Sequence, residues 1–249
     1  MSSEFKCLRD PAELAARIEE WLASQVGRTG AKGVVVGLSG GIDSAVASAI
    51  AERIFHRDML TVIMPCHSDP RDAEDALLVA NHFDIPCKTV DLSETFDVLT
   101  ASMRKTELVL SDMALANIKA RLRMVTLYGV AQSRSYLVCG TSNRSEWEIG
   151  YFTKYGDSAS DLLPLIGLLK CEVRAVARYL GVPGSIVAKP PTAGLWTGQT
   201  DEKEMGFGYD ELDRYLATGQ ADPGTARKIE DMRQKSEHKR HPAPACLLP

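Results

Sequence analysis

The chain has 249 residues, of which 45% are hydrophobic and 25% charged, and its formal net charge is -4. The apolar content excludes an intrinsically disordered chain, and the length allows a core that needs neither disulfides nor a structural metal. The acidic balance provides no overall positive field of the kind that attracts nucleic acid or anionic lipid, so we expect neither partner.

The N-terminal residues show no basic stretch followed by an apolar run, and the sequence contains no apolar segment of about 18 residues. We therefore expect neither secretion nor a membrane span. The six cysteines are scattered without a CxxC pair, which favours reduced thiols over a metal or redox site. Together these features predict a cytoplasmic protein.

In chain order, the first half alternates helical periodicity with short apolar runs. We expect helices over residues 11–25, 44–55, 72–83 and 111–131, and buried strands over residues 33–38, 60–64, 86–90 and 136–139. Asp10 is the expected N-cap of the first helix, because Pro11 follows at its first turn. Strands that alternate with helices predict an α/β fold, a doubly wound parallel sheet with helices on both faces.

The second half of the chain carries weaker periodicity. A polar loop is expected over residues 150–161, and helices over residues 170–180, 209–216 and 226–237. The segment 189–208 is rich in Pro, Thr and Gly, and we interpret it as a long loop that closes over the site as a lid. Without repeats or an obvious linker, the chain is predicted to form a single domain over residues 1–249, with its core over about 10–240 and an extended tail over 241–249.

The strongest chemical signal is the segment SGGIDS at residues 39–44, between the first buried strand and a helix. Glycines let a backbone approach an anion closely, and the N–H groups at a helix N-terminus favour negative charge. Ser39 and Ser44 offer hydroxyl donors, while Asp43 can hold a hard cation that bridges phosphate oxygens. The segment is neither a G-x-x-x-x-G-K-[ST] loop nor a G-x-G-x-x-G loop, so a nicotinamide-dependent dehydrogenase loses its main support.

The SGGIDS segment resembles the pyrophosphate loop (PP-loop) of the N-type ATP pyrophosphatases, which adenylate a substrate and release pyrophosphate. Further segments narrow the resemblance to the NAD synthetases: NIKARLRM at 117–124, GTSNRSE at 140–146, GYFTKYGD at 150–157, DLLPL at 161–165, PTAGLW at 191–196, QTDE at 199–202 and SEHKR at 236–240. The resemblance implies an adenine nucleotide alpha hydrolase-like fold. It also implies a ligase that amidates deamido-NAD with ammonia and Mg-ATP, through an acyl-adenylate, as the last step of NAD biosynthesis.

The resemblance assigns expected roles to individual residues. Those expected to bind ATP are Gly37, Leu38, Ser39, Gly40, Gly41, Ile42, Asp43, Ser44, Thr141, Lys170 and Thr192. The expected ligands of the Mg²⁺ cofactor are Asp43 and Glu146, which follow two different strands and can therefore meet at one edge of a parallel sheet. Considered without the family, Thr141 would be a simple helix cap and Lys170 a surface charge at the start of a helix.

A second group of residues is expected to bind deamido-NAD: Arg121, Lys154, Asp161, His238 and Lys239. Asp157 and Lys170 are the expected catalytic residues, and Asp157 is the candidate to orient or deprotonate ammonium. Without the resemblance, Arg121 would be interpreted as a solvated helix arginine and Asp157 as a turn residue.

Two positions depart from the pattern of some family members. Gly194 stands where those members have aspartate, and Ser142-Asn143 stands where they have Asp-His, which affects the expected side contacts to the dinucleotide. Two other interpretations are a different ATP pyrophosphatase, such as a tRNA-thiolating or GMP-forming relative, and a nucleotide-binding regulatory protein without turnover. The lack of paired cysteines argues against a thiolating enzyme, and the retained Asp43, Glu146, Lys170 and Thr192 argue against a regulatory protein.

The family resemblance also bears on assembly and on the nitrogen donor. The NAD synthetases are homodimeric, which implies a C2 dimer with the dinucleotide site near the subunit boundary. The family signatures occupy nearly all of the 249 residues, so we expect no glutaminase domain. Free ammonia, or ammonia delivered by a partner, is therefore the expected nitrogen donor.

Overall fold

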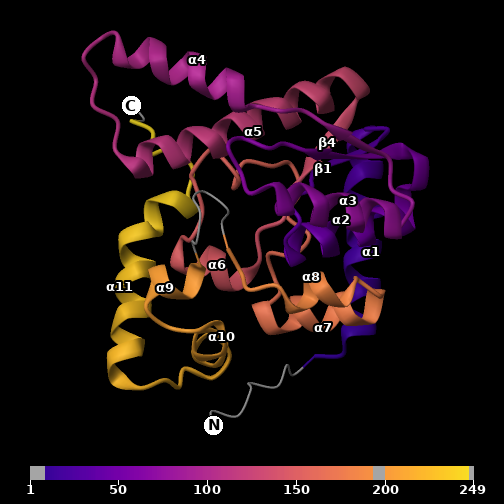
Figure 1. Ribbon diagram of the computed structural model, residues 1–249. Helices are drawn as coiled ribbons and strands as arrows, with labels where there is room; N and C mark the ends of the chain where they lie inside the picture. Colours follow the sequence, from indigo (N-terminus) through magenta and orange to yellow (C-terminus); the bar gives the residue numbers. More distant parts are fainter. Residues whose placement is uncertain (1–8, 193–199, 247–249) are drawn as a thin grey trace.

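The computed structural model describes residues 9–192 and 200–246, and a four-stranded parallel sheet lies at its centre (Figure 1). The strands are β1 Gly33–Gly37, β2 Met59–Ile63, β3 Cys87–Thr89 and β4 Tyr136–Cys139. The α-helices of the described residues are α1 Pro11–Thr29, α2 Ile42–Phe55, α3 Pro70–His82, α4 Ser93–Arg104, α5 Asp112–Arg134, α6 Arg144–Ile149, α7 Lys170–Leu180, α8 Gly184–Ala188, α9 Asp201–Met205, α10 Tyr209–Thr218 and α11 Pro223–Arg240.

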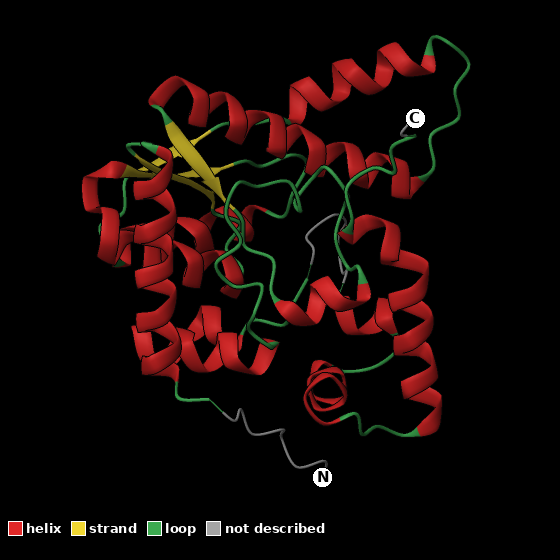
Figure 2. Cartoon of the chain, turned by 180° about the vertical axis from the view of Figure 1, so that it is seen from behind, coloured by secondary structure: helices red, strands yellow, loops and turns green. Residues whose placement is uncertain are grey.

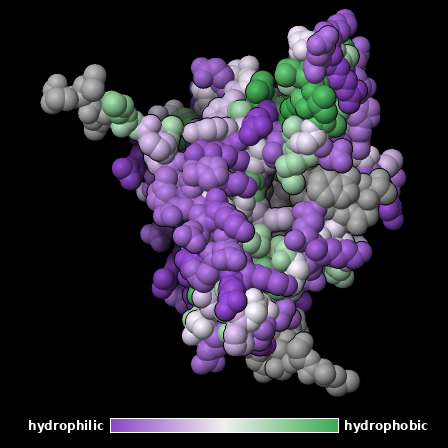
Figure 3. Space-filling view, turned by 90° about the vertical axis from the view of Figure 1, so that its left-hand side faces the viewer, coloured by the Kyte–Doolittle hydropathy of each residue, from purple (hydrophilic) through white to green (hydrophobic). Residues whose placement is uncertain are grey.

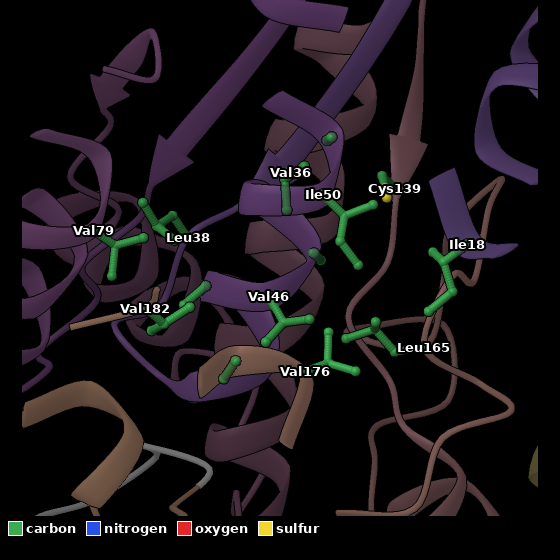
Figure 4. Packing of buried hydrophobic residues seen from close by; sticks show 14 of the residues in the cluster. Ile18, Val36, Leu38, Val46, Ile50, Val79, Cys139, Leu165, Val176 and Val182 are labelled. Atoms are coloured by element: carbon green, nitrogen blue, oxygen red, sulfur yellow. The ribbon is translucent and has the colours of Figure 1, made fainter. Parts of the chain in front are cut away.

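Alternating side chains of the strands build two cores, one on each face of the sheet. Val34 and Val36 of β1 pack with residues of α1, α2 and α7, whereas Val35 packs with β2 residues and with α5 on the other face. Figure 4 shows the first core, in which Val46 and Ile50 of α2 lie between the sheet and α7. The doubly wound architecture predicted from the alternation of elements is therefore confirmed.

The strand order β3-β2-β1-β4 explains where a ligand can bind. The chain runs from β1 outward to β2 and β3, then returns to add β4 on the other side of β1. The loops after β1 and β4 consequently diverge, and open parallel sheets bind ligands in the crevice at such a switch point. Figure 2 shows helices on both sides of the strands, with α10 and α11 set apart from the sheet.

The start of α1 and the end of α7 lie where the sequence predicts them. Asp10 is the N-cap of α1, since its Oδ1 accepts hydrogen bonds from the N–H groups of Ala12 at 2.8 Å and Glu13 at 3.1 Å. Gly181 ends α7 in the left-handed conformation with φ of 80°. The last helix is longer than the predicted 226–237, because Asp222 caps it and Pro223 begins it.

Several helices were not predicted from the sequence. α4 lies in a region left without an element, α6 begins inside the GTSNRSE segment, and α8 precedes the predicted loop. The interpretation of residues 189–208 as one long loop is wrong at α9, a short helix over Asp201–Met205. Residues 193–199 of the predicted lid, Gly194 among them, lie outside the described residues.

The described residues also show the state of the cysteines and the hydropathy of the helices. In the described ranges five cysteines are free thiols: Cys66, Cys87, Cys139, Cys171 and Cys246. Across residues 9–192 and 200–246, no helix combines the length and the hydropathy that a membrane crossing requires.

Candidate active site

The SGGIDS loop connects β1 to α2 at the carboxyl edge of the sheet. Gly40 has φ of 80°, and a Cβ atom on it would lie 2.4 Å from the carbonyl oxygen of Asp72, so only glycine fits there. Ser44 Oγ accepts the N–H of Ser39 at 3.2 Å and donates to the carbonyl of Gly41 at 2.9 Å. Because α2 has no side-chain cap, the loop presents backbone N–H groups at a helix N-terminus, which suits an anion.

The structure places Lys170 between the two carboxylates predicted to bind magnesium. Its Nζ donates to Asp43 Oδ2 at 2.6 Å and to Glu146 Oε1 at 2.9 Å, and its side chain is only 2% exposed. Asn143 Nδ2 donates to the other oxygen of Asp43 at 2.8 Å. These residues come from α2, α6 and α7, so the fold joins segments more than 100 residues apart into one charged cluster.

Two residues that the sequence did not single out complete this cluster. The hydroxyl of Tyr209 lies 3.1 Å from Glu146 Oε1 and 2.9 Å from Asp201 Oδ2, and both Tyr209 and Asp201 are buried. The ring of Tyr209 also lies beneath Lys170, with Nζ 4.9 Å from the ring centroid. Asp201 lies in the QTDE segment of the family resemblance, which assigned it no role, and Tyr209 lies at a predicted helix start and showed no chemical pattern of its own.

Burial and mutual charge shift the pKa values of the cluster in opposite senses. Burial raises the pKa of Glu146 to about 7, although the nearby Lys170 ammonium favours the ionised form. Burial disfavours the Lys170 ammonium, but the carboxylates of Asp43 and Glu146 outweigh it and raise its pKa above the usual value. At neutral pH the cluster therefore holds one firm positive charge between carboxylates, one of which is poised to gain or lose a proton.

A cavity of about 1020 Å³ runs from the SGGIDS loop to the C-terminal helix α11. It is lined by most of the residues predicted to bind substrates: Gly37, Leu38, Ser39, Gly41, Ile42, Asp43, Ser44, Arg121, Thr141, Glu146, Lys154, Asp157, Lys170, Thr192, His238 and Lys239. Gly40 and Asp161 do not line it among the described residues. The Asp161 carboxylate accepts the N–H of Val138 in β4 at 2.8 Å and the Tyr128 hydroxyl at 3.3 Å, so its expected substrate contact stays a prediction.

The predicted substrate-binding residues meet where α5 and α11 close on the loop after α6. Arg121 Nη2 donates to the carbonyl of Lys154 at 3.2 Å, and Lys154 Nζ donates to the carbonyl of His238. Lys239 Nζ donates to the carbonyls of Gly150 and Phe152 at 2.8 and 2.9 Å, and burial lowers its pKa. The structure therefore gathers Arg121, Lys154, His238 and Lys239 at one end of the cavity.

Asp157 is also part of this end of the cavity. Its Oδ1 accepts the N–H of Thr153 at 2.8 Å, and the hydroxyl of Thr153 donates to Asn117 Oδ1 of α5 at 2.7 Å. These contacts fix the turn that carries Asp157 against α5, the helix that also carries Arg121.

Sequence reasoning missed two further cations at the cavity. Arg123 of α5 is half-buried, and its Nε donates to the carbonyl of Met64 at 3.0 Å and its Nη2 to Ser68 Oγ at 3.1 Å. Lys189 Nζ donates to Asp72 Oδ1 at 2.9 Å and to Asp75 Oδ2 at 2.6 Å, which ties the segment after α8 to α3. Arg123 lies in the NIKARLRM segment, but only the fold shows that its guanidinium reaches Met64 and Ser68.

Comparison with known proteins shows the family to which the chain belongs. The family model described as NAD synthase matches residues 14–243, almost the whole chain. The chain belongs to the NAD synthase family. It is 46% identical over 243 residues to the NH(3)-dependent NAD(+) synthetase of Syntrophomonas wolfei, an alignment that covers 96% of this chain and 98% of that protein.

Solved structures of the NAD synthase family agree with the fold described above. The NMN synthetase of Francisella tularensis has a TM-score of 0.92 and 37% identity, covering 96% of this chain and 100% of that one. The NH3-dependent NAD synthetase of Campylobacter jejuni has a TM-score of 0.81 and 28% identity, with 96% and 100% covered. Both relatives are thus similar to this chain along their entire length.

Proposed function

We propose that this family member is a ligase that amidates deamido-NAD with ammonia, consuming ATP and releasing AMP and pyrophosphate as the last step of NAD biosynthesis. The observation that carries this proposal is the buried Lys170 between Asp43 and Glu146, beside a helix N-terminus that can hold pyrophosphate. In the first step a carboxylate must attack an anionic α-phosphate, so the site has to neutralise both anions. This need is met by a loop of N–H groups, an ammonium, and two carboxylates that can hold a cation.

The ATP-binding roles that we propose follow from where each group lies. The SGGIDS loop would receive the pyrophosphate portion, and Lys170, Thr141 and Thr192 line the same cavity. The oxygen atoms of Asp43 and Glu146 are the ligands that Mg²⁺ prefers, and the two carboxylates are close enough to share one ammonium. When bound there, Mg²⁺ would neutralise charge on the phosphate oxygens.

At the other end of the cavity we propose that Arg121, Lys154, His238 and Lys239 bind deamido-NAD. Three of these carry positive charge, which suits the phosphates and the carboxylate of that substrate. Asp157, on the turn packed against α5, would orient ammonium and accept its proton before nitrogen attacks the acyl-adenylate. Asp161 would assist from the edge of this end by fixing β4.

One assay tests the proposed reaction. The protein is incubated with ATP, Mg²⁺, deamido-NAD and ammonium, and NAD, AMP and pyrophosphate are measured. We expect all three in equal amounts and only when deamido-NAD is present. ATP binding without turnover would refute the proposal in favour of a regulatory protein, and pyrophosphate release without deamido-NAD would indicate another ATP pyrophosphatase.

A matched pair of variants tests the placement of the site. Glu146→Gln removes a carboxylate from the cluster and should abolish most turnover. Glu148→Gln changes the same residue type on the same short helix, but Glu148 pairs with Arg233 at 3.0 Å outside the cavity. Turnover that survives in Glu146→Gln as well as in Glu148→Gln would contradict the assignment.

A second candidate substrate follows from the likeness to NMN synthetase. The Francisella tularensis structure has the higher TM-score of the two, 0.92 against 0.81. Nicotinate mononucleotide, the acid that amidation converts to NMN, shares with deamido-NAD the nicotinate that is amidated and lacks the AMP half. Measuring kcat/KM for each of the two acids distinguishes these substrates. A higher kcat/KM for nicotinate mononucleotide would show that it, and not deamido-NAD, is the main substrate.

We also propose a homodimer, because one surface exposes many apolar side chains. The α4–α5 surface consists of the exposed residues Val98, Leu99, Leu108, Val109 and Met113 on α4, α5 and the segment between them. Figure 3 shows apolar side chains gathered near the top of that face of the molecule. A contiguous exposed apolar surface of this kind marks an interaction site, and a second copy of the chain would cover it.

Sedimentation velocity tests the dimer. The wild-type protein should sediment as a dimer, and Val109→Glu on the α4–α5 surface should shift it toward monomer. Leu77→Glu is the control, because Leu77 is an exposed apolar residue of α3 outside that surface. A stable monomer in the wild type would refute the dimer.

The free thiols of the described residues fit a reducing compartment, and we propose the cytoplasm.

A further inference from the structure

A buried carboxylate on α10 holds the first turn of α7, the helix that begins at Lys170. Asp213 Oδ2 accepts the N–H of Cys171 at 2.7 Å, and its Oδ1 accepts the hydroxyl of Ser145 at 2.5 Å. The N–H of Lys170 donates in turn to Ser145 Oγ at 2.9 Å. Asp213 and Ser145 are both 0% exposed, so these contacts are shielded from water.

This arrangement satisfies the requirements of a buried carboxylate and of a helix N-terminus together. A buried carboxylate needs hydrogen-bond donors, and the first N–H groups of a helix have no acceptor within the helix. At α7 the negative charge also meets the positive end of the helix dipole. The N–H of Leu169 donates to Glu172 Oε2 at 2.9 Å, and Arg9 pairs with Glu172, so the same turn is held from a second side.

The helix α10 connects this turn to the charged cluster by a second contact. Tyr209 and Asp213 are four residues apart and therefore lie on the same face of α10. Tyr209 reaches Glu146 and Lys170 through their side chains, whereas Asp213 reaches Lys170 through the backbone and Ser145, the residue before Glu146. Figure 1 shows α10 below α6, away from the sheet that carries the SGGIDS loop.

We propose that Asp213 is a positioning residue for adenylation. Through Ser145 and the first turn of α7, it holds Glu146 and Lys170 at the separation at which the Lys170 ammonium can contact both Glu146 and Asp43. The inference rests on the proposed function, because Asp213 touches no reacting group and acts only through Lys170 and Glu146.

Asparagine at this position is nearly isosteric but chemically unsuited. The groups that face the Asp213 side chain are donors: the Ser145 hydroxyl and the N–H groups of Lys170 and Cys171. An asparagine amide has one acceptor oxygen and a donor NH₂ group. If the oxygen keeps the N–H of Cys171, the NH₂ group faces the N–H of Lys170, which is a donor, and the Ser145 hydroxyl, which must turn from donor to acceptor. Asparagine also lacks the negative charge that meets the start of α7, so the first turn is held less firmly, and a displacement of about 1 Å can lower a rate by about 10²-fold.

The experiment measures kcat, KM for ATP and unfolding temperature for Asp213→Asn with deamido-NAD, ATP and ammonium. The concentration of folded sites is taken from the stoichiometry of ATP binding by calorimetry. We expect kcat per folded site to fall by about 10- to 100-fold, with KM for ATP close to that of the wild type. The control is Thr100→Val, which removes a buried hydroxyl that donates to carbonyls within α4, a helix that carries none of the proposed site residues, and should leave kcat unchanged.

Ser145→Ala is the second variant and tests the same contact if Asp213→Asn does not fold. It removes the hydroxyl that links Asp213 to the N–H of Lys170 by two hydrogen bonds, and it should also lower kcat. A kcat per folded site equal to that of the wild type in either folded variant would overturn the inference. Failure of the wild type to amidate deamido-NAD would refute the proposed function, whereas variants as active as the wild type would refute only the role of Asp213.

Discussion

Replacing Lys170 by methionine tests how the charged cluster is balanced. Met keeps a side chain of similar length but removes the ammonium that contacts Asp43 at 2.6 Å and Glu146 at 2.9 Å. Removing one partner of a buried ion pair costs about 3–5 kcal/mol of unfolding free energy. The carboxylates of Asp43 and Glu146 are 18% and 17% exposed, which argues for the lower end of that range.

The loss should depend on pH in a defined direction. In the wild type the pKa of Glu146 is about 7, already raised by burial, and loss of the ammonium removes an influence that lowers it. The folded variant therefore keeps a proton at pH 8 that the unfolded chain has released, so its stability falls more steeply as pH rises. Since one pKa unit corresponds to about 1.4 kcal/mol, the destabilisation should be about 1 kcal/mol larger at pH 8 than at pH 6.

Urea unfolding followed by tryptophan fluorescence, in EDTA at pH 6 and pH 8, measures both effects. Lys189→Met is the matched control, because Lys189 also contacts two carboxylates but its side chain is 23% exposed. Its loss should be about 1 kcal/mol or less and nearly equal at the two pH values. A Lys170→Met protein as stable as the wild type, or destabilised more at pH 6 than at pH 8, would refute the reasoning.

Three further predictions concern the loop, the base and the metal. Gly40→Ala should destabilise the protein by more than the roughly 1–2 kcal/mol of a left-handed residue, because the new methyl group meets the carbonyl of Asp72, and thermal unfolding measures this. Asp157→Asn should slow amide formation while ATP binding persists, which initial rates at varied ammonium would show; unchanged ammonium kinetics would exclude Asp157 as the base. EDTA should stop turnover and added Mg²⁺ should restore it, whereas turnover that persists in EDTA would exclude the proposed role of Asp43 and Glu146.

The parts of the fold that follow local physics could be predicted from the sequence. Continuous apolar runs identified β1, β2 and β4, and Asp10 with Pro11 identified the start of α1. Helix α6 has six residues and α8 has five, fewer than two turns, so no periodicity can show them. Helix α4 is as amphipathic as the predicted α1, so its pattern over Ser93–Arg104 was present in the sequence and was overlooked.

The candidate site divides in the same way. Residues inside dense local motifs, such as Asp43 and Glu146, were found because their neighbours restrict what the segment can be. Asp201 lies in the QTDE segment without a residue-level signal for its role, and Tyr209 and Asp213 lie outside the quoted motifs, where an aspartate on a helix is ordinarily solvated. What the fold adds is burial against groups distant in the sequence, for example the 3.1 Å contact between Tyr209 and Glu146, which are 63 positions apart.

The charged cluster explains why the sheet alone cannot form the site. The sheet and α2 supply the SGGIDS loop with Asp43, but Lys170 lies on α7 and the contacts that orient it come from α6 and α10. Lys170 is charged and 2% exposed, so its place between two carboxylates is stable only while those later helices keep water out and satisfy the first turn of α7. The C-terminal helices therefore supply more than the proposed contacts to deamido-NAD, since the geometry of the cavity end at which we propose ATP binding depends on them as well.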